Sequence, residues 1–313
     1  MDRALRESGR LGDLVRTGHL LRRAGRSGEA LSAFAAAWRG PAGARAEDAI
    51  GELLAEAAPE ERLELAPALE ELAAAGLPGA DELLAAWFPA AADVVGSSPA
   101  ARALRGFLYR QAQGAAPVLL WGEPGVGRAL AARTLHRLIG RAGFHEAYAP
   151  QRTARLLEEV AERAPAGGTL YLSYADPHDA ERWAEPLLAL CAARGARLVI
   201  GATGQPLEGA LAAIEARLEL PPLRERLEDL PLLVAALLAR AGAPQAARAL
   251  DPKLIGMLRW HDWPGNVREL ANHVARAVLA AGDRLAEVPE QLLQGLFGLP
   301  GEVGEELPAS PED

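Results

Sequence analysis

Hydrophobic positions in the first part of the chain follow helical spacing. From Leu11 to about Trp87 apolar residues recur every three or four positions, with breaks at Gly40-Pro41, Pro59 and Gly76–Gly79. This spacing places apolar side chains on one face of a helix, and glycine and proline end such segments. We therefore predict several short helices packed on one another, and no strand, in residues 1–90.

One stretch of this region resembles a single tetratricopeptide unit. In it, small residues would let two helices approach, and Phe34 would fill the seam between them; the pattern consists of Gly18, Leu21, Gly25, Ala30, Phe34 and Ala37. A plain helical bundle explains the pattern equally well, because a repeat array needs about three units to bury its faces. In either case the region is expected to dock a partner or to act as a spacer.

The pattern changes in residues 91–225, where short apolar runs alternate with helical segments. Four runs are predicted as strands: Val118–Trp121, Ala147–Ala149, Leu170–Leu172 and Leu198–Ile200. Alternating strands and helices predict an α/β fold with a parallel sheet. Residues 226–292 return to helical spacing, broken at Gly242, Pro244 and Trp263–Gly265, and are predicted to form a small helical lid. Residues 293–313 are predicted to be an acidic, disordered tail.

The run from Val118 to Ala129 indicates a strand followed by a phosphate-binding loop. Glycines in such a loop allow backbone N–H groups to point at phosphate oxygens, and the helix that follows adds its positive dipole end. The predicted nucleotide-binding residues here are Gly122, Glu123, Pro124, Gly125, Val126, Gly127, Arg128 and Ala129.

Arg128 stands where this loop normally carries lysine. Arginine keeps the charge, but presents it as a broad planar fork instead of a compact ammonium group. Two plainer explanations stay open: a chance glycine turn between strand and helix, and a bias against lysine, since Lys253 is the only lysine in the chain.

Composition and charge indicate an ordinary globular protein and argue against direct DNA binding. The 313 residues are 50% hydrophobic and 24% charged, as in ordinary globular proteins. Most of the net charge of −9 lies after Gly282, so the body is nearly neutral and we expect no direct DNA binding. Five tryptophans are expected to anchor helices rather than to stack on bases: Trp38, Trp87, Trp183, Trp260 and Trp263.

The single cysteine and the short apolar runs indicate the compartment. Cys191 has no second thiol with which to form a disulfide or a metal site. The longest apolar runs, such as Leu230–Ala239, are about half the length of a membrane span. We therefore expect a cytoplasmic protein without a membrane segment.

Further motifs give the chain a family resemblance. They are Val95–Arg102, Gly167–Leu172, Leu220–Pro231 and Trp263–Leu270. With the phosphate loop, they resemble the AAA+ domain of sigma-54-dependent transcription activators, the bacterial enhancer-binding proteins, over roughly Asp93–Pro289. The resemblance implies an α/β fold, an AAA+ P-loop parallel sheet with a helical lid, here preceded by an all-α region. It also implies ATP bound between sheet and lid, arginine fingers from ring neighbours, and a loop that contacts sigma-54.

Arg268 matches the lid arginine of this family that reaches the nucleotide phosphates. It is therefore a further predicted nucleotide-binding residue. The plainer alternative is a structural arginine at the start of a helix, with Trp263 in the core.

Several family residues needed for catalysis and activation are replaced or missing. The strand that should end in Asp-Glu ends in Ser173-Tyr174, and Gly204 stands where the family has a water-positioning asparagine. Asp176 is expected to cap a helix rather than to hold a metal. The arginine-finger segment is absent, leaving Arg217 as the sole arginine between Gln205 and Leu220, and neither a sigma-contact loop nor a C-terminal helix-turn-helix is found.

These departures favour a pseudo-ATPase, because phosphoryl transfer depends on metal placement and an oriented water. The favoured hypothesis is a non-hydrolysing module that regulates transcription or signalling by binding proteins, including other AAA+ activator subunits, with oligomer formation allowed. We assign no catalytic residue and no metal ligand, and we expect weak ATP or ADP binding without Mg²⁺. The alternatives are a nucleotide switch or slow ATPase using Arg128 and Arg268, and a regulator acting through sigma-54 RNA polymerase.

Overall fold

The structure is a computed structural model and describes residues 14–40, 43–141, 143–148, 153–175, 182–204, 209–248, 252–282 and 288–297. These residues divide into two compact units. The first lies within Met1–Val94, Pro99–Trp121 and Ala129–Glu219, and the second within Val95–Ser98, Gly122–Arg128 and Leu220–Asp313. The predicted C-terminal tail, 293–313, lies mostly outside the described residues.

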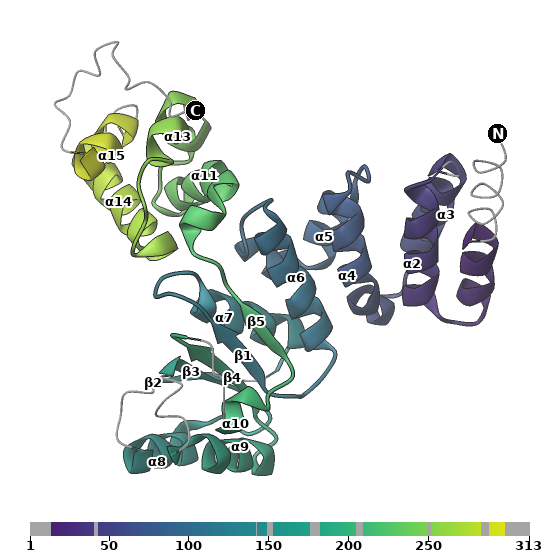
Figure 1. Ribbon diagram of the computed structural model, residues 1–313, viewed down its shortest axis with the longest axis horizontal. Coiled ribbons are helices and arrows are strands. Elements are labelled where there is room, and N and C mark those ends of the chain that lie inside the picture. Colours follow the sequence, from purple (N-terminus) through teal and green to yellow (C-terminus); the bar gives the residue numbers. More distant parts are fainter. Residues whose placement is uncertain are drawn as a thin grey trace. The chain divides into compact units, whose positions relative to one another are not determined.

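The N-terminal part of the first unit is helical, as its apolar spacing predicts. Its helices are 14–23, α2 (Ser27–Trp38), α3 (Gly43–Glu56), α4 (Pro59–Ala74), α5 (Ala80–Trp87), the 3-10 helix η1 (Pro89–Asp93) and α6 (Pro99–Ala112) (Figure 1). Helix α2 packs on α3 and α4, and α4 packs on α5 and α6. Their shared core is dominated by leucines, and it extends to Tyr109 on α6.

The predicted seam around Phe34 is present. Phe34 is fully buried, and a Cβ added to Gly18 would lie 2.4 Å from its ring. Only glycine therefore lets helix 14–23 approach α2 this closely. The contact fits both a tetratricopeptide unit and a plain bundle.

The rest of the first unit contains a five-stranded parallel sheet, which confirms the predicted α/β class. The strands are β1 (Val118–Trp121), β2 (Phe144–Tyr148), β3 (Thr169–Ala175), β4 (Arg197–Ala202) and β5 (Arg217–Glu219). Their order is β2-β3-β4-β1-β5, with Leu119 opposite Ile200 on β4 and Arg217 on β5.

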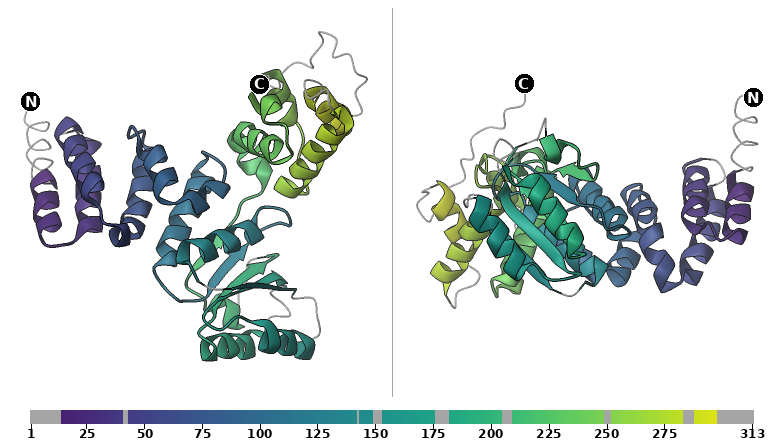
Figure 2. Two further views of the ribbon diagram at one scale, coloured as in Figure 1. Left: turned by 180° about the vertical axis from the view of Figure 1, so that it is seen from behind. Right: turned by 90° about the horizontal axis from the view of Figure 1, so that it is seen from below.

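Two layers of helices cover the sheet. One face packs on α8 (Thr153–Arg163) and α9 (Ala184–Ala193), with the short α10 (Gly209–Ala212) nearby, through a core that includes Leu156, Leu187 and Cys191 (Figure 1). Helices α6 and α7 (Arg128–Ile139) lie on the other side of the sheet, and Figure 2 shows the same layering from behind. The four predicted strands are all present. β5 was not predicted because it has only three residues and lies at the sheet edge.

The second unit contains the helical lid. Its elements are the 3-10 helices η3 (Leu223–Glu225) and η4 (Leu227–Asp229), followed by α11 (Leu230–Arg240), α12 (Pro244–Arg248), α13 (Pro252–Leu258), α14 (Asn266–Ala281) and α15 (Val288–Phe297). Trp263 is fully buried in its core, and its indole Nε1 donates a hydrogen bond to the Leu258 carbonyl at 3.0 Å. Among the residues described, no helix combines the length and apolar character that a membrane crossing requires.

Candidate functional site

The predicted phosphate loop leaves the carboxyl end of β1 with its glycines in the left-handed region. Gly122, Gly125 and Gly127 have φ values of 143°, 87° and 115°. At two of them a side chain would also collide with backbone. An added Cβ would lie 2.4 Å from the Leu220 carbonyl oxygen at Gly122, and 2.1 Å from the Gly265 carbonyl oxygen at Gly125. These glycines thus permit a positive φ and a close approach between the loop and the lid backbone.

Glu123 connects the loop to two lid residues. Arg224 donates to both carboxylate oxygens, at 2.9 Å and 2.6 Å, in a bidentate pair. Asn266 Nδ2 donates to Glu123 Oε2 at 3.1 Å. These bonds lower the pKa of Glu123 to about 2, Arg224 having the largest effect and Asn266 the next.

Asn266 is the most highly connected polar side chain of this contact. It is fully buried with φ of 54°, at the first position of α14. Its amide donates to the Pro124 carbonyl at 3.1 Å as well as to Glu123, and its Oδ1 accepts the Leu223 backbone N–H at 2.7 Å. One side chain therefore joins the phosphate loop, η3 and the start of α14.

Arg226 adds a second link between loop and lid. Its guanidinium is buried and donates to the Val126 carbonyl oxygen at 2.8 Å. Burial lowers the pKa of Arg226, and the nearby Asp229 opposes that effect. The loop is thus held on both sides of Gly125 by residues of the Leu220–Pro231 motif and by Asn266.

A buried carboxylate joins the first motif to the same lid segment. Asp229 is fully buried and accepts the backbone N–H groups of Ser97 and Ser98, both at 2.8 Å, and the Ser98 hydroxyl at 2.6 Å. A Cβ at Gly96 would lie 2.7 Å from this carboxylate. The sequence Gly96-Ser97-Ser98 therefore forms a binding turn for Asp229 within the second unit.

The two predicted cationic residues are placed differently. Arg128, the first residue of α7, is buried, whereas Arg268 on α14 is exposed. The Arg268 Cβ lies 3.2 Å from the Cβ position of Gly125, so the side chain starts beside the loop. Of the other predicted site residues, Val126 is buried, Pro124 is exposed, and Gly122, Glu123, Gly125, Gly127 and Ala129 are partly exposed.

Ser173, at a position where the family resemblance predicts a carboxylate, contacts the neighbouring strand. The Ser173 side chain on β3 is buried, and its hydroxyl donates to the Ala147 carbonyl of β2 at 3.2 Å. At Gly204, just after β4, an added Cβ would meet only open space. Asp176 lies outside the described residues. Within the described ranges, no group of three or more His, Cys, Asp or Glu side chains is placed to hold a metal ion.

Sequence reasoning pointed to the loop and to Arg268 as nucleotide-binding residues, and it missed the contacts that join loop and lid. The roles of Glu123, Asn266 and Asp229 depend on partners more than 100 residues away. No local signal singled out Asp229 or Asn266, because the motifs that contain them also carry other polar residues, such as Arg224 and Glu269. Sequence reasoning included Ala129 in the loop but did not consider that it has no hydroxyl where P-loops carry a magnesium-binding serine or threonine.

The parallel sheet, the glycine loop after β1 and the helical lid define an AAA+ fold. Residues 224–295 match the AAA+ ATPase lid domain family. The chain is 30% identical over 266 residues to the nitrogen assimilation regulatory protein NtrX of Azorhizobium caulinodans, covering 70% of this chain and 56% of that protein. It is 30% identical over 264 residues to the response regulator protein PilR of Pseudomonas aeruginosa, covering 66% and 58%.

Other similar proteins extend this comparison. The anaerobic nitric oxide reductase transcription regulator NorR of Vibrio vulnificus is 28% identical over 253 residues, covering 66% of this chain and 49% of that protein. The crystal structure of NtrX from Brucella abortus in complex with ADP superposes with a TM-score of 0.52 at 25% identity, over 78% of this chain and 62% of that chain. The same protein in complex with ATP gives a TM-score of 0.51. The chain spans about half the length of the curated relatives, and over that span it is similar to bacterial regulatory proteins that include NtrX, PilR and NorR.

Proposed function

We propose that this chain is an AAA+ module of the sigma-54-activator type that does not hydrolyse ATP and that regulates transcription or signalling by binding other proteins. One observation carries the proposal: Glu123, Asn266 and Arg226 join the loop to the lid, while the two positions where the family resemblance predicts carboxylates hold Ser173 and Tyr174. The Ser173 hydroxyl is already engaged with the neighbouring strand. The residues that hold the loop to the lid are therefore present, whereas the residues expected to place the metal and the water are not.

The residues of the second unit fit the phosphates of a nucleotide. Glycines with positive φ let consecutive backbone N–H groups face an anion, and Arg128 begins a helix whose N-terminus favours negative charge. Arg268 starts next to the loop and would add a second cation. A bound nucleotide would supply phosphate charge to these groups, and NtrX from Brucella abortus has been crystallised with both ADP and ATP.

The same residues do not fit a catalytic Mg²⁺ ion. Magnesium binds oxygen ligands, usually one or two carboxylates together with phosphate oxygens. Ala129 has no side-chain oxygen, Ser173 donates its hydroxyl to Ala147, and Gly204 has no side chain. We therefore propose weak, metal-independent binding of ATP or ADP, and derive no hydrolytic step.

Calorimetry and a phosphate-release assay test this proposal together. Purified protein is titrated with ATP and with ADP, with and without Mg²⁺, and inorganic phosphate is followed over time. We expect no turnover and no gain in affinity from Mg²⁺. Steady phosphate release that stops in an Arg128→Ala variant would overturn the proposal, because that loss would show genuine catalysis in the loop.

A restoration experiment sharpens this test. The double variant Ser173→Asp, Tyr174→Glu returns both carboxylates, and a triple variant adds Gly204→Asn. Magnesium-dependent nucleotide binding is expected to appear with the carboxylates, since they provide the missing oxygen ligands. If the variants fold and still show no magnesium dependence, the replaced carboxylates are not the reason that the metal is absent.

A nucleotide-gated switch is the second candidate function. The contacts of Glu123, Asn266 and Arg226 connect the loop directly to lid residues. Nucleotide bound at the loop would therefore change the stability of the lid helices. Hydrogen exchange of α14 with and without ADP tests this candidate, and protection that rises with ADP but without turnover would support it. Activation through sigma-54 polymerase is a third candidate, which a promoter-melting assay tests.

A further inference from the structure

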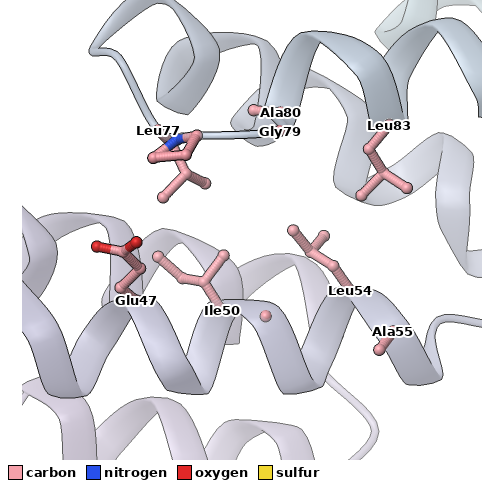
Figure 3. Close-up of a pocket in the computed structure, with 10 residues that line it drawn as sticks. Glu47, Ile50, Leu54, Ala55, Leu77, Gly79, Ala80 and Leu83 are labelled. Carbon is pink, nitrogen blue, oxygen red and sulfur yellow. The ribbon is translucent and has the colours of Figure 1, made fainter.

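The described N-terminal helices contain a pocket that has no part in the nucleotide site. It lies between α3 and the segment from the end of α4 into α5, and has a volume of about 380 Å³. Figure 3 shows the side chains of the two walls facing one another across the opening. The pocket is lined by Glu47, Ile50, Gly51, Leu54, Ala55, Leu77, Pro78, Gly79, Ala80 and Leu83.

The walls of the pocket are apolar, and several of their side chains are buried in the helical core. Ile50 and Ala80 are at most 2% exposed, and Leu54 and Leu77 are both 8% exposed, because they also belong to the helical core. Side chains fixed by a core present a preformed surface, which lowers the entropy cost of binding. The volume falls at the lower end of the roughly 300–1,000 Å³ of ligand pockets, which is room for a few aliphatic side chains.

Gly51 opens the middle of this pocket. It lies in the interior of α3, where glycine costs about 0.5–1 kcal/mol relative to alanine. Nothing lies within 4 Å of a Cβ added at Gly51, so no neighbour requires the glycine. The destabilising residue is therefore unnecessary for packing, but any side chain at this position would project toward the open space.

Acidic side chains lie at the pocket and on its two helices. Other acidic residues of this region are already paired with arginines, as Glu52 and Glu56 are with Arg22 and Asp81 is with Arg102. Glu47 lies at one end of the pocket beside Leu77, and it is the only charged residue that lines it (Figure 3). Asp48 on α3 and Glu82 on α5 are exposed on the same two helices. Complementary charge steers and aligns a partner, so a basic segment is favoured over an acidic one.

We propose that this pocket binds a basic segment of a partner protein, which inserts leucine-like side chains between α3 and α5 and places arginine or lysine beside Glu47. The inference rests on the protein-binding role proposed above and names the chemistry of the partner. A small polar ligand is disfavoured, because specific small-molecule sites bring several polar groups together and only one lines this pocket. An amphipathic helix with apolar anchors one turn apart suits a groove between two helices.

Fluorescence anisotropy with designed peptides tests the proposal without nucleotide, so it can fail separately from the pseudo-ATPase proposal. The probe is a labelled helical peptide with leucines at positions i and i+4 and flanking arginines. Matched peptides carry glutamate for arginine or serine for leucine. The full chain is expected to bind the arginine–leucine peptide at least about tenfold more tightly than either matched peptide, a difference of ~1.4 kcal/mol. Equal binding of all three peptides would overturn the proposal.

Two pairs of variants locate the binding site. Gly51→Leu fills the pocket, whereas Ala44→Leu adds the same side chain on α3 outside the lining. Glu47→Lys reverses the charge at the pocket, and Glu158→Lys makes the same change at an exposed residue of α8, outside the pocket lining. We expect Gly51→Leu and Glu47→Lys to weaken peptide binding about tenfold, and both controls to bind like the unmodified chain.

Folding and competing occupants are checked in the same series. Circular dichroism should show that Gly51→Leu is folded, since leucine is a better helix former than glycine. If this variant does not fold, peptide binding by Glu47→Lys is the deciding measurement. Unchanged binding by folded Gly51→Leu would overturn the proposal. So would a dimer that dissociates in Gly51→Leu, which would place a second copy in the pocket. A tenfold gain in affinity after removal of residues 1–13 would place that segment there and would also overturn it.

Discussion

Single residues decide how the phosphate loop is held, and Asn266 is the clearest case. Its backbone has φ of 54°, a region where asparagine is tolerated better than most residues, and its side chain makes three hydrogen bonds. The motif Trp263–Leu270 marked this segment as important, but sequence alone pointed to Arg268. The buried amide became visible only through its distant partners.

Replacing Asn266 by alanine should destabilise the protein by about 2–4 kcal/mol. The change leaves the Leu223 N–H and the Pro124 carbonyl without their partner and forces alanine into positive φ. Asn266→Gly removes the same bonds but tolerates the backbone, so it should be less destabilising. Urea denaturation of both variants measures this, and equal stability of Asn266→Ala and the unmodified chain would contradict the role assigned to the amide.

The contribution of Glu123 to the stability of the protein should depend on pH in the acid range. Its pKa is lowered to about 2, first by Arg224 and then by Asn266, so its contribution to stability is complete above pH ~4.5 and falls as the pH drops toward ~2. Both side chains of the Glu123–Arg224 pair are more than one third exposed, so solvent screens the interaction and its contribution to stability is small. Unfolding free energies of Glu123→Gln and the unmodified chain should therefore converge as the pH is lowered from 6 to 3. A constant difference across this range would show that the carboxylate charge is irrelevant.

Burial of the tryptophans was only partly predictable at this scale. Trp183 and Trp263 are 3% and 0% exposed, as expected for helix anchors, but Trp260 is 55% exposed and the prediction was wrong there. Trp260 and Trp263 lie only three residues apart, and each has a charged residue directly before it in the chain. What separates them is the turn at residues 259–263 that directs only Trp263 into the lid core.

At the level of elements, the contact between α4 and α6 depends on one buried carboxylate. Glu70 on α4 is 3% exposed, and Arg105 on α6 donates to it at 2.5 Å through Nη2 and 3.0 Å through Nε. Arg102 lies 3.4 Å from the same oxygen and also pairs with Asp81 of α5. The network therefore fastens α6 to two of the N-terminal helices.

Glu70→Ala should cost about 3–5 kcal/mol, because it leaves Arg105 without its buried partner. Glu71→Ala is the matched control, since the neighbouring glutamate is exposed, and should change stability by less than about 0.5 kcal/mol. Thermal and urea denaturation of the pair measure the difference. Similar losses for both variants would mean that the helix rather than the ion pair was damaged.

The local sequence pattern predicted which segments are strands better than it predicted where each strand begins and ends. β1 was predicted with its exact bounds, because four consecutive apolar residues precede the glycine loop. β2 begins at Phe144 and β3 extends to Ala175, beyond the predicted runs, because polar residues such as His145 and Ser173 pair in the ladder. Hydrogen bonding to a neighbouring strand extends a strand regardless of its own hydropathy.

For the molecule as a whole, α6 joins the N-terminal helices and the sheet into one unit. Tyr109 on α6 is 1% exposed and packs on Phe88, with ring centroids 4.8 Å apart. On the other side, Arg197 at the start of β4 donates to the Gln111 and Gly114 carbonyls at 2.6 Å and 2.8 Å. The core of the N-terminal helices thus continues past residue 90 into the segment that precedes the phosphate loop.

Removing residues 1–90 should expose this core and cause association. A chain that begins at residue 91 loses the apolar partners of Tyr109 and the carboxylate held by Arg105, so it should bind the dye ANS and elute as aggregates in gel filtration. A chain that begins at residue 14 is the control and should behave like the full chain. A monomeric, ANS-negative product of the larger deletion would show that the 91–225 segment and the lid fold without the N-terminal helices.

The sequence by itself determined the helical and α/β regions and the glycine loop after a strand, because these features depend on neighbours along the chain. Tertiary structure alone decided that Asn266, Glu123 and Asp229 hold the loop and the first motif to the lid segment. It also placed the pocket between α3 and α5. Contacts of this kind join residues far apart in the chain, and no local pattern specifies the partner that folding places beside a polar group.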